Sequence, residues 1–256
     1  MKQQNKICLS LSIKNISKNY DKIKALKNVS FDAYKGEIIA LLGPNGAGKS
    51  TLMNIISGYL SSSDGDVFVN GNKVSTDDSK TKKDIGFLSE GAPMYSDMTV
   101  ELFLKYMIEL KLIFCESDNL SKQEIKKIYN EEFEKIVETA KIESVLKQKI
   151  ETLSKGYLRR VGFAQSIIGD PSILLLDEPT DGLDPNQKDH MRKLIKEMGK
   201  NKTIVISTHL LEEAENIASR IILIDKGVLV ADGDLKEILT KTKTKSLEKA
   251  FRLLTN

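Results

Sequence analysis

Residues 43–51 read GPNGAGKST and match the phosphate-binding pattern G-x-x-x-x-G-K-[ST], with a second hydroxyl residue at the end. The residues before this stretch, IIALL at 38–42, are all apolar and predict a buried strand. The residues STLMNIIS at 50–57 predict the start of a helix. Because a strand, a glycine-rich loop and a helix follow one another as the pattern requires, this stretch predicts a site for a nucleoside triphosphate.

The composition of the loop explains how it would hold phosphate groups. Its glycines let the backbone approach the phosphates closely, and the start of the helix adds the positive end of its dipole. We expect Lys49 to reach the outer phosphates and the hydroxyl of Ser50 to bind Mg²⁺. The loop residues expected to contact the nucleotide are Gly43, Pro44, Asn45, Gly46, Ala47, Gly48, Lys49, Ser50 and Thr51.

Length, charge and cysteine content restrict the class of protein. The 256 residues fit one α/β domain, and a net charge of +3 is too small to indicate a nucleic-acid partner. Cys8 and Cys115 fit neither a zinc spacing nor a disulfide framework, which favours reduced thiols in a cytoplasmic protein. The N-terminus lacks the apolar region of a signal peptide, and every apolar run is far shorter than the ~20 residues that cross a bilayer. Any role at a membrane is therefore expected to depend on another protein.

The rest of the chain predicts alternating strands and helices. Apolar and polar residues alternate, as in half-buried antiparallel strands, at 9–16, 29–33 and 66–71. Continuous apolar runs predict further strands at 85–88, 173–179, 203–207 and 221–225. Capping residues predict helices that begin after Thr99, Ser121, Ser154 and Asp184. Gly199 is expected to end the last of these helices.

Two of the expected helices carry apolar residues at helical spacing, which predicts packing against a core and not a cofactor site. The inward residues expected in the first are Leu102, Phe103, Tyr106, Met107 and Leu110. Those expected in the second are Ile125, Ile128, Ile136, Val137 and Ala140.

Five motifs, in the right order, resemble the nucleotide-binding subunit of ATP-binding cassette (ABC) transporters over nearly the whole chain. GPNGAGKST resembles the Walker A motif and ILLLDEP the Walker B motif. LSKGY at 153–157 resembles the family signature, DGLDP at 181–185 the D-loop, and STH at 207–209 the histidine switch.

The resemblance implies an α/β fold of the P-loop NTPase type, with a mainly parallel core sheet, an N-terminal antiparallel β-layer and a helical insertion subdomain. It implies an ABC ATPase domain at 9–238, with the insertion at about 97–167. Residues 239–256 are expected to form a C-terminal linker and a short helix.

The resemblance also implies roles for single residues. Tyr20, expected in a polar loop, stands where the family stacks an aromatic ring on adenine. Asp177 would hold Mg²⁺ opposite Ser50, and Glu178 would orient or deprotonate the attacking water. His209 would contact the γ-phosphate. The expected activity is hydrolysis of ATP with Mg²⁺.

In the family, two such domains pair head to tail. Ser154 and Gly156 would then bind the ATP held by a second ABC ATPase subunit, identical or different. The other expected partner is an integral membrane permease, which would hold the chain at the cytoplasmic face of the cell membrane.

Two positions depart from the family pattern. The signature has Lys155 where LSGGQ is common, and Glu90 replaces a glutamine that links Mg²⁺ and the γ-phosphate to the membrane subunit. We expect Glu90 to bind Mg²⁺ or its water, while Lys155 either faces phosphate or is simply exposed. LSKGY, the run IGFLSE at 85–90 and SLEKAFRLL at 246–254 resemble the branch that pairs with ABC-2 type export subunits. The alternative is a soluble ABC ATPase that acts on a ribosome or nucleic-acid complex.

Overall fold

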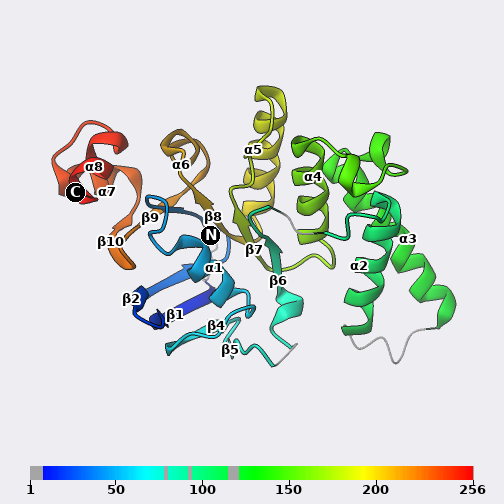
Figure 1. The fold of residues 1–256 in the computed structure, drawn as a ribbon, viewed down its shortest axis with the longest axis horizontal. Helices are drawn as coiled ribbons and strands as arrows, with labels where there is room; N and C mark the ends of the chain where they lie inside the picture. Colours follow the sequence, from blue (N-terminus) through cyan, green and yellow to red (C-terminus); the bar gives the residue numbers. More distant parts are fainter. Residues whose placement is uncertain (1–7, 78–79, 92–93, 115–120, 256) are drawn as a thin grey trace, which may run out of the picture.

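The computed structural model describes residues 8–77, 80–91, 94–114 and 121–255 (Figure 1). Cys115 lies outside these ranges, so the expectation of two thiols can be followed only for Cys8, which is exposed. Across the described residues, no helix combines the length and the apolar character needed to cross a membrane. Two sheets and the helices around them form the expected α/β architecture.

The larger sheet has the strand order β10-β9-β3-β8-β7-β6. Its strands are β3 (Ile38–Leu42), β6 (Ile85–Leu88), β7 (Ile173–Asp177), β8 (Thr203–Thr208), β9 (Arg220–Asp225) and β10 (Val228–Gly233). All neighbouring strands are parallel except β10, which is an antiparallel edge strand that the sequence did not predict. Strands β3 and β7 lie on either side of β8, so their carboxyl ends, which lead to the phosphate-binding loop and to Glu178, open at one edge of the sheet.

The smaller sheet is antiparallel and has the order β2-β1-β4-β5. Its strands are β1 (Leu9–Tyr20), β2 (Ile23–Tyr34), β4 (Asp64–Val69) and β5 (Asn72–Lys73). The first two are longer than the alternating pattern predicts and pair along a hairpin in which Tyr20 faces Ile23. Tyr20 therefore ends a strand and does not lie in the expected loop. The inner face of this sheet and helix α1 (Lys49–Ile56) share one apolar core with the larger sheet.

A helical group lies between β6 and β7 in the chain and stands to one side of the sheets (Figure 1). It contains α2 (Val100–Phe114), α3 (Lys122–Ala140) and α4 (Lys155–Ser166), with the short 3-10 turns η3 (Glu143–Val145) and η4 (Ile150–Thr152) between the last two. A further such turn, η1 (Lys82–Asp84), precedes β6.

The predicted inward faces of α2 and α3 are partly wrong. Leu102 is 55% exposed, and Leu104 and Ile108 are buried in its place. Ile128 of α3 is also exposed. Apolar residues occupy most positions of α2, so their spacing alone does not select which face meets the core.

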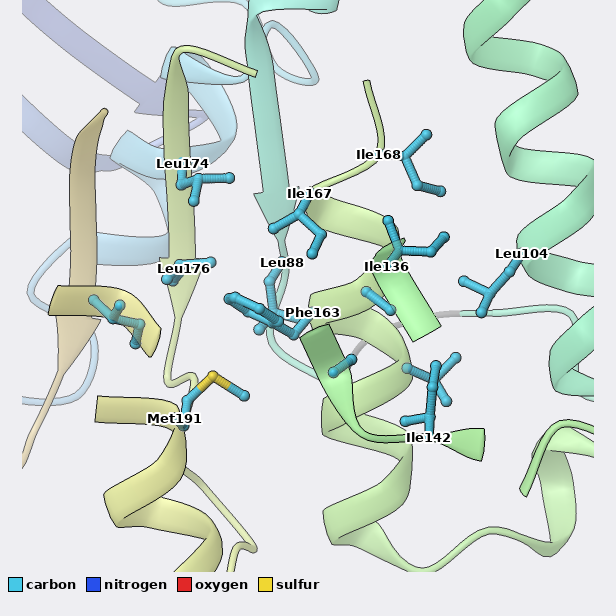
Figure 2. Packing of buried hydrophobic residues seen from close by; sticks show 14 of the residues in the cluster. Leu88, Leu104, Ile136, Ile142, Phe163, Ile167, Ile168, Leu174, Leu176 and Met191 are labelled. Carbon is cyan, nitrogen blue, oxygen red and sulfur yellow. The ribbon is translucent and has the colours of Figure 1, made fainter. Parts of the chain in front are cut away.

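Phe163 of α4 joins the helical group to the larger sheet. Figure 2 shows its ring beside Leu88 and Leu176, which come from β6 and β7, with Met191 of α5 (Pro185–Gly199) below them. Phe163 is fully buried, so α4 cannot shift without disturbing the strand that ends at Asp177.

Helix α5 begins after Asp184 and ends at Gly199, as predicted. The side chain of Asp184 accepts a hydrogen bond of 2.9 Å from the Gln187 N–H, and Pro185 is the first helical residue. Gly199 is the last residue of the helix rather than a left-handed cap. A Cβ atom there would lie 2.4 Å from Cδ1 of Ile38, so a larger residue would displace that side chain of β3.

The C-terminal residues pack on the domain. Helices α6 (Leu211–Ile217), α7 (Leu235–Thr242) and α8 (Leu247–Leu254) surround a third apolar cluster on the larger sheet. Leu247 and Ala250 of α8 are fully buried in it. The expected boundary after residue 238 falls inside α7, so residues 239–242 are helix and not linker.

Candidate functional site

The phosphate-binding loop joins β3 to α1 in a shape that only glycines permit. Gly48, the residue before α1, has φ of 107°, a left-handed value that residues with a Cβ rarely adopt. A Cβ on Gly43 would lie 2.2 Å from the carbonyl oxygen of Ile224. The Ala47 carbonyl accepts a hydrogen bond of 3.0 Å from the N–H of Gly227, so the turn between β9 and β10 braces the loop.

Lys49 lies folded back across this loop and is only 7% exposed. Its Nζ donates hydrogen bonds to the carbonyl oxygens of Gly43, at 2.7 Å, and Pro44, at 3.1 Å. An ammonium group has three N–H donors, so one remains for an anion. Burial lowers the pKa of Lys49 below its usual value, and the carboxylates of Glu178, Asp177 and Glu90 oppose that shift.

A cavity of about 350 Å³ opens over the loop. It is lined by Ala25, Asn45, Gly46, Gly48, Lys49, Ser50, Thr51, Glu90, Asp177 and Glu178. The fold thus brings together the glycine-rich loop, the end of β7 and Glu90, which lies two residues after β6. A lysine and the N-terminus of a helix on one side, with carboxylates on the other, suit a phosphate chain together with a cation.

The oxygen donors of the cavity fit Mg²⁺. They are the hydroxyl of Ser50 and the carboxylates of Asp177 and Glu90, and Mg²⁺ prefers such ligands. Over the ranges that the structure describes, no group of three or more His, Cys, Asp and Glu side chains could hold a metal ion unaided.

Asp177 and Glu178 are adjacent but differ in environment. Asp177 ends β7, is 3% exposed, and accepts a hydrogen bond from the hydroxyl of Ser207 on β8. Glu178 has φ of 51°, so the backbone turns sharply after the strand rather than continuing it to residue 179 as predicted. The turn brings Glu178 Oε1 to 2.9 Å from Nδ1 of His209.

Several predicted site residues do not line the cavity. His209 reaches it only through Glu178, and Tyr20 is 44% exposed at the end of β1 with the Lys18 ammonium 5.3 Å from its ring centroid. Ser154 is exposed at the start of α4, where it accepts a hydrogen bond of 3.3 Å from the N–H of Tyr157. Gly156, also outside the cavity, packs against α5.

Arg159 is a buried residue of α4 that the sequence analysis missed. Its Nη1 donates hydrogen bonds to the backbone carbonyl oxygens of Ser89, at 3.2 Å, and Asp177, at 3.4 Å. The residue next to Ser89 is Glu90, so Arg159 connects α4 to the two segments that carry the cavity carboxylates Glu90 and Asp177. An arginine within a helix gives no sequence signal for such contacts.

Comparison with known proteins identifies the class of this fold and site. Residues 26–181 match a protein family that is described as "ABC transporter". The chain is 35% identical over 228 residues to an uncharacterized ABC transporter ATP-binding protein, YdbJ, of Bacillus subtilis, covering 88% of this chain and 70% of that one. It is 32% identical to the linearmycin resistance ATP-binding protein LnrL of the same organism, covering 90% and 71%.

A solved structure agrees with this assignment. The dimeric post-hydrolysis state of the ATP-binding cassette MJ0796, bound to ADP and Pi, superposes with a TM-score of 0.77 and 30% identity, covering 88% of this chain and 98% of that one. The protein belongs to the ABC transporter family and is an ATP-binding subunit with the ABC ATPase cassette fold.

Proposed function

We propose that this chain hydrolyses ATP with Mg²⁺ and thereby drives export through a separate membrane permease. The observation that carries the proposal is the position of Lys49, buried in one cavity with Asp177, Glu178 and Glu90. The buried ammonium and the helix N-terminus suit negatively charged phosphate groups, and the carboxylates suit the cation that accompanies them.

The proposed roles follow from the cavity. Residues 43–51 bind the phosphates, and Ser50, Asp177 and Glu90 hold Mg²⁺. When bound, Mg²⁺ neutralises charge on the phosphate oxygens. Glu178 accepts a proton from, or orients, the attacking water, and His209 holds the Glu178 carboxylate through the 2.9 Å contact.

A second subunit completes the proposed site. Ser154 and Gly156 lie at the N-terminus of α4 and outside the cavity of their own chain, which leaves Ser154 exposed for another chain. The dimeric state of MJ0796, bound to ADP and Pi, supports pairing of two cassettes. The second cassette is either an identical copy or a different ABC ATPase subunit.

The membrane part of the proposal rests on the relatives. YdbJ and LnrL are both named as ATP-binding proteins, YdbJ of an ABC transporter and LnrL of linearmycin resistance. Removal of a toxic compound from the cell is an export function, so this relative favours export. On this proposal the chain is cytoplasmic and binds the inner face of the cell membrane through its permease.

The direct test uses Lys49→Ala, with Lys24→Ala as the matched control at an exposed position of β2. Binding of ATP and release of phosphate are measured with and without Mg²⁺. We expect Lys49→Ala to lose both, because the outer phosphates lose the cation of the loop, while the control keeps both. Equal turnover in wild type and Lys49→Ala would refute the proposed site.

A further inference from the structure

Glu213 of α6 is a buried carboxylate outside the nucleotide cavity. It is 2% exposed and lies on a short helix between the buried strands β8 and β9. One carboxylate oxygen accepts a hydrogen bond from the hydroxyl of Thr180, and the other accepts one of 2.7 Å from the hydroxyl of Thr208. Both threonines are themselves buried, with 1% and 0% exposure.

These two threonines belong to the loops that carry Glu178 and His209. Thr180 comes two residues after Glu178, within a turn in which the Asp181 N–H donates to the Glu178 carbonyl at 3.1 Å. Thr208 directly precedes His209 and ends β8. One carboxylate that does not line the cavity therefore holds both loops through its two hydrogen bonds.

The backbone around Thr208 shows how tightly this end of β8 is held. The Thr208 hydroxyl donates to Glu213 and accepts a hydrogen bond of 3.1 Å from the N–H of Leu210. These two bonds fix the residues on either side of His209. Because buried polar groups without partners are costly, removing the Glu213 carboxylate would leave two buried hydroxyls to find new partners.

We propose that Glu213 is a positioning residue for the ATPase reaction, which sets the relative position of Glu178 and His209 by holding Thr180 and Thr208 together. This inference rests on the proposed function. Glu213 touches neither nucleotide nor water in this role. Without it, the loops move independently, and the 2.9 Å contact between Glu178 and His209 is no longer enforced.

The test compares Glu213→Ala and Glu213→Gln with Glu212→Gln, an exposed position on the same helix whose carboxylate pairs with Arg192. We expect Glu213→Ala to lower kcat by about 10- to 100-fold, the effect of misplacing a reacting group, with KM for ATP within about two-fold. Glu213→Gln should recover part of the loss, since an amide can still accept from one hydroxyl and donate to the other.

A second readout does not depend on activity. The chain has only two histidines, His190 and His209, so their ring resonances can be followed by NMR. We expect the His209 signal to shift in Glu213→Ala and Thr208→Val, while the His190 signal stays in place. Thr180→Val and Thr208→Val, which nearly preserve shape, replace Glu213→Ala if that variant does not fold.

The outcomes separate the two ideas. Wild-type kcat and an unmoved His209 signal in Glu213→Ala, or in both valine variants, would overturn the positioning role. A rise in KM that accounts for the whole loss would also overturn it. If wild type and Glu212→Gln hydrolyse no ATP, the proposed function fails, and the His209 signal alone decides whether Glu213 positions the pair.

Discussion

His209 Nδ1 lies 2.9 Å from Glu178 Oε1, although the two residues are 31 positions apart in the chain. The contact forms because the Glu178 N–H donates a hydrogen bond of 3.1 Å to the carbonyl of Ser207, which joins the end of β7 to β8. Glu178 lines the nucleotide cavity and His209 does not. His209 therefore contacts a carboxylate of the cavity wall without lining the cavity itself.

The first prediction concerns the shape of the phosphate-binding loop. We expect Gly43→Ala to lower the free energy of unfolding by about 3 kcal/mol, the upper end of the cost of overpacking a core, and to abolish ATP binding. The reason is the 2.2 Å approach of the new Cβ to the Ile224 carbonyl in a buried strand.

Gly71→Ala is the matched control for this prediction. Gly71 has φ of 81° and nothing within 4 Å of an added Cβ, so the substitution should cost only the about 1–2 kcal/mol of a left-handed residue and leave ATP binding intact. Denaturant unfolding and nucleotide binding are measured on both variants. Equal losses of stability and of ATP binding in the two variants would show that the close approach to the Ile224 carbonyl is not the cause.

The second prediction concerns how stability depends on pH. Burial raises the pKa of Glu213 above 4.5, and nearby Glu178 adds to the shift, while the Thr208 hydrogen bond, Arg192 and Lys188 oppose it. At pH values between 4.5 and the pKa that Glu213 has in the folded protein, Glu213 is protonated in the folded state and ionised in the unfolded state. Wild type therefore loses stability from this group as pH rises through that window.

Glu213→Gln removes this titration. We expect the difference in unfolding free energy, Glu213→Gln minus wild type, to become more favourable to the variant as pH rises above 4.5. Glu212→Gln controls for the lost charge at an exposed position of the same helix. A difference that is constant from pH 4.5 to 8, or that falls, would contradict the prediction.

The local parts of the site could be predicted from the sequence because each is a continuous stretch. The strand, glycine loop and helix around Lys49 share one segment, and Asp177 and Glu178 directly follow four apolar residues of β7. Parallel strands then bring these ends to one edge of a sheet, so their proximity also follows from the pattern.

The contacts made by single polar residues could not be predicted. Glu213 and Arg159 belong to none of the five motifs, and their partners are a pair of hydroxyls and a pair of backbone carbonyls. Such partners are set by how α4 and α6 pack on the sheet. The C-terminal stretch contains the expected short helix, but the burial of Leu247 and Ala250, three residues apart on one face of α8, depends on how that helix packs on the sheet.

The third prediction concerns Tyr20. We expect Tyr20→Ala to weaken ATP binding by the about 1–3 kcal/mol that stacking on a base provides, with little change in kcat. The ring is 44% exposed at the end of β1, and Ala25 of the facing strand β2 lines the cavity. Tyr59→Ala is the control, since that side chain is 82% exposed and lies outside the cavity. Unchanged affinity in Tyr20→Ala would assign the adenine to another surface.

The last prediction separates binding from chemistry. Glu178→Gln keeps the shape of the residue and leaves Asp177 and Ser50 in place, but it weakens the base and removes one negative charge from the cavity. We therefore expect turnover nearly to stop while a dimer accumulates with Mg-ATP, which light scattering detects. ADP or no nucleotide should give monomers.

Adding Ser154→Arg should abolish the dimer, because a bulky cation replaces the exposed hydroxyl at the start of α4. If the native partner is a different cassette, the dimer forms on mixing the two. Dimers that ignore both nucleotide and the Ser154 substitution would place the subunit contact on another surface and remove the support for a shared ATP site.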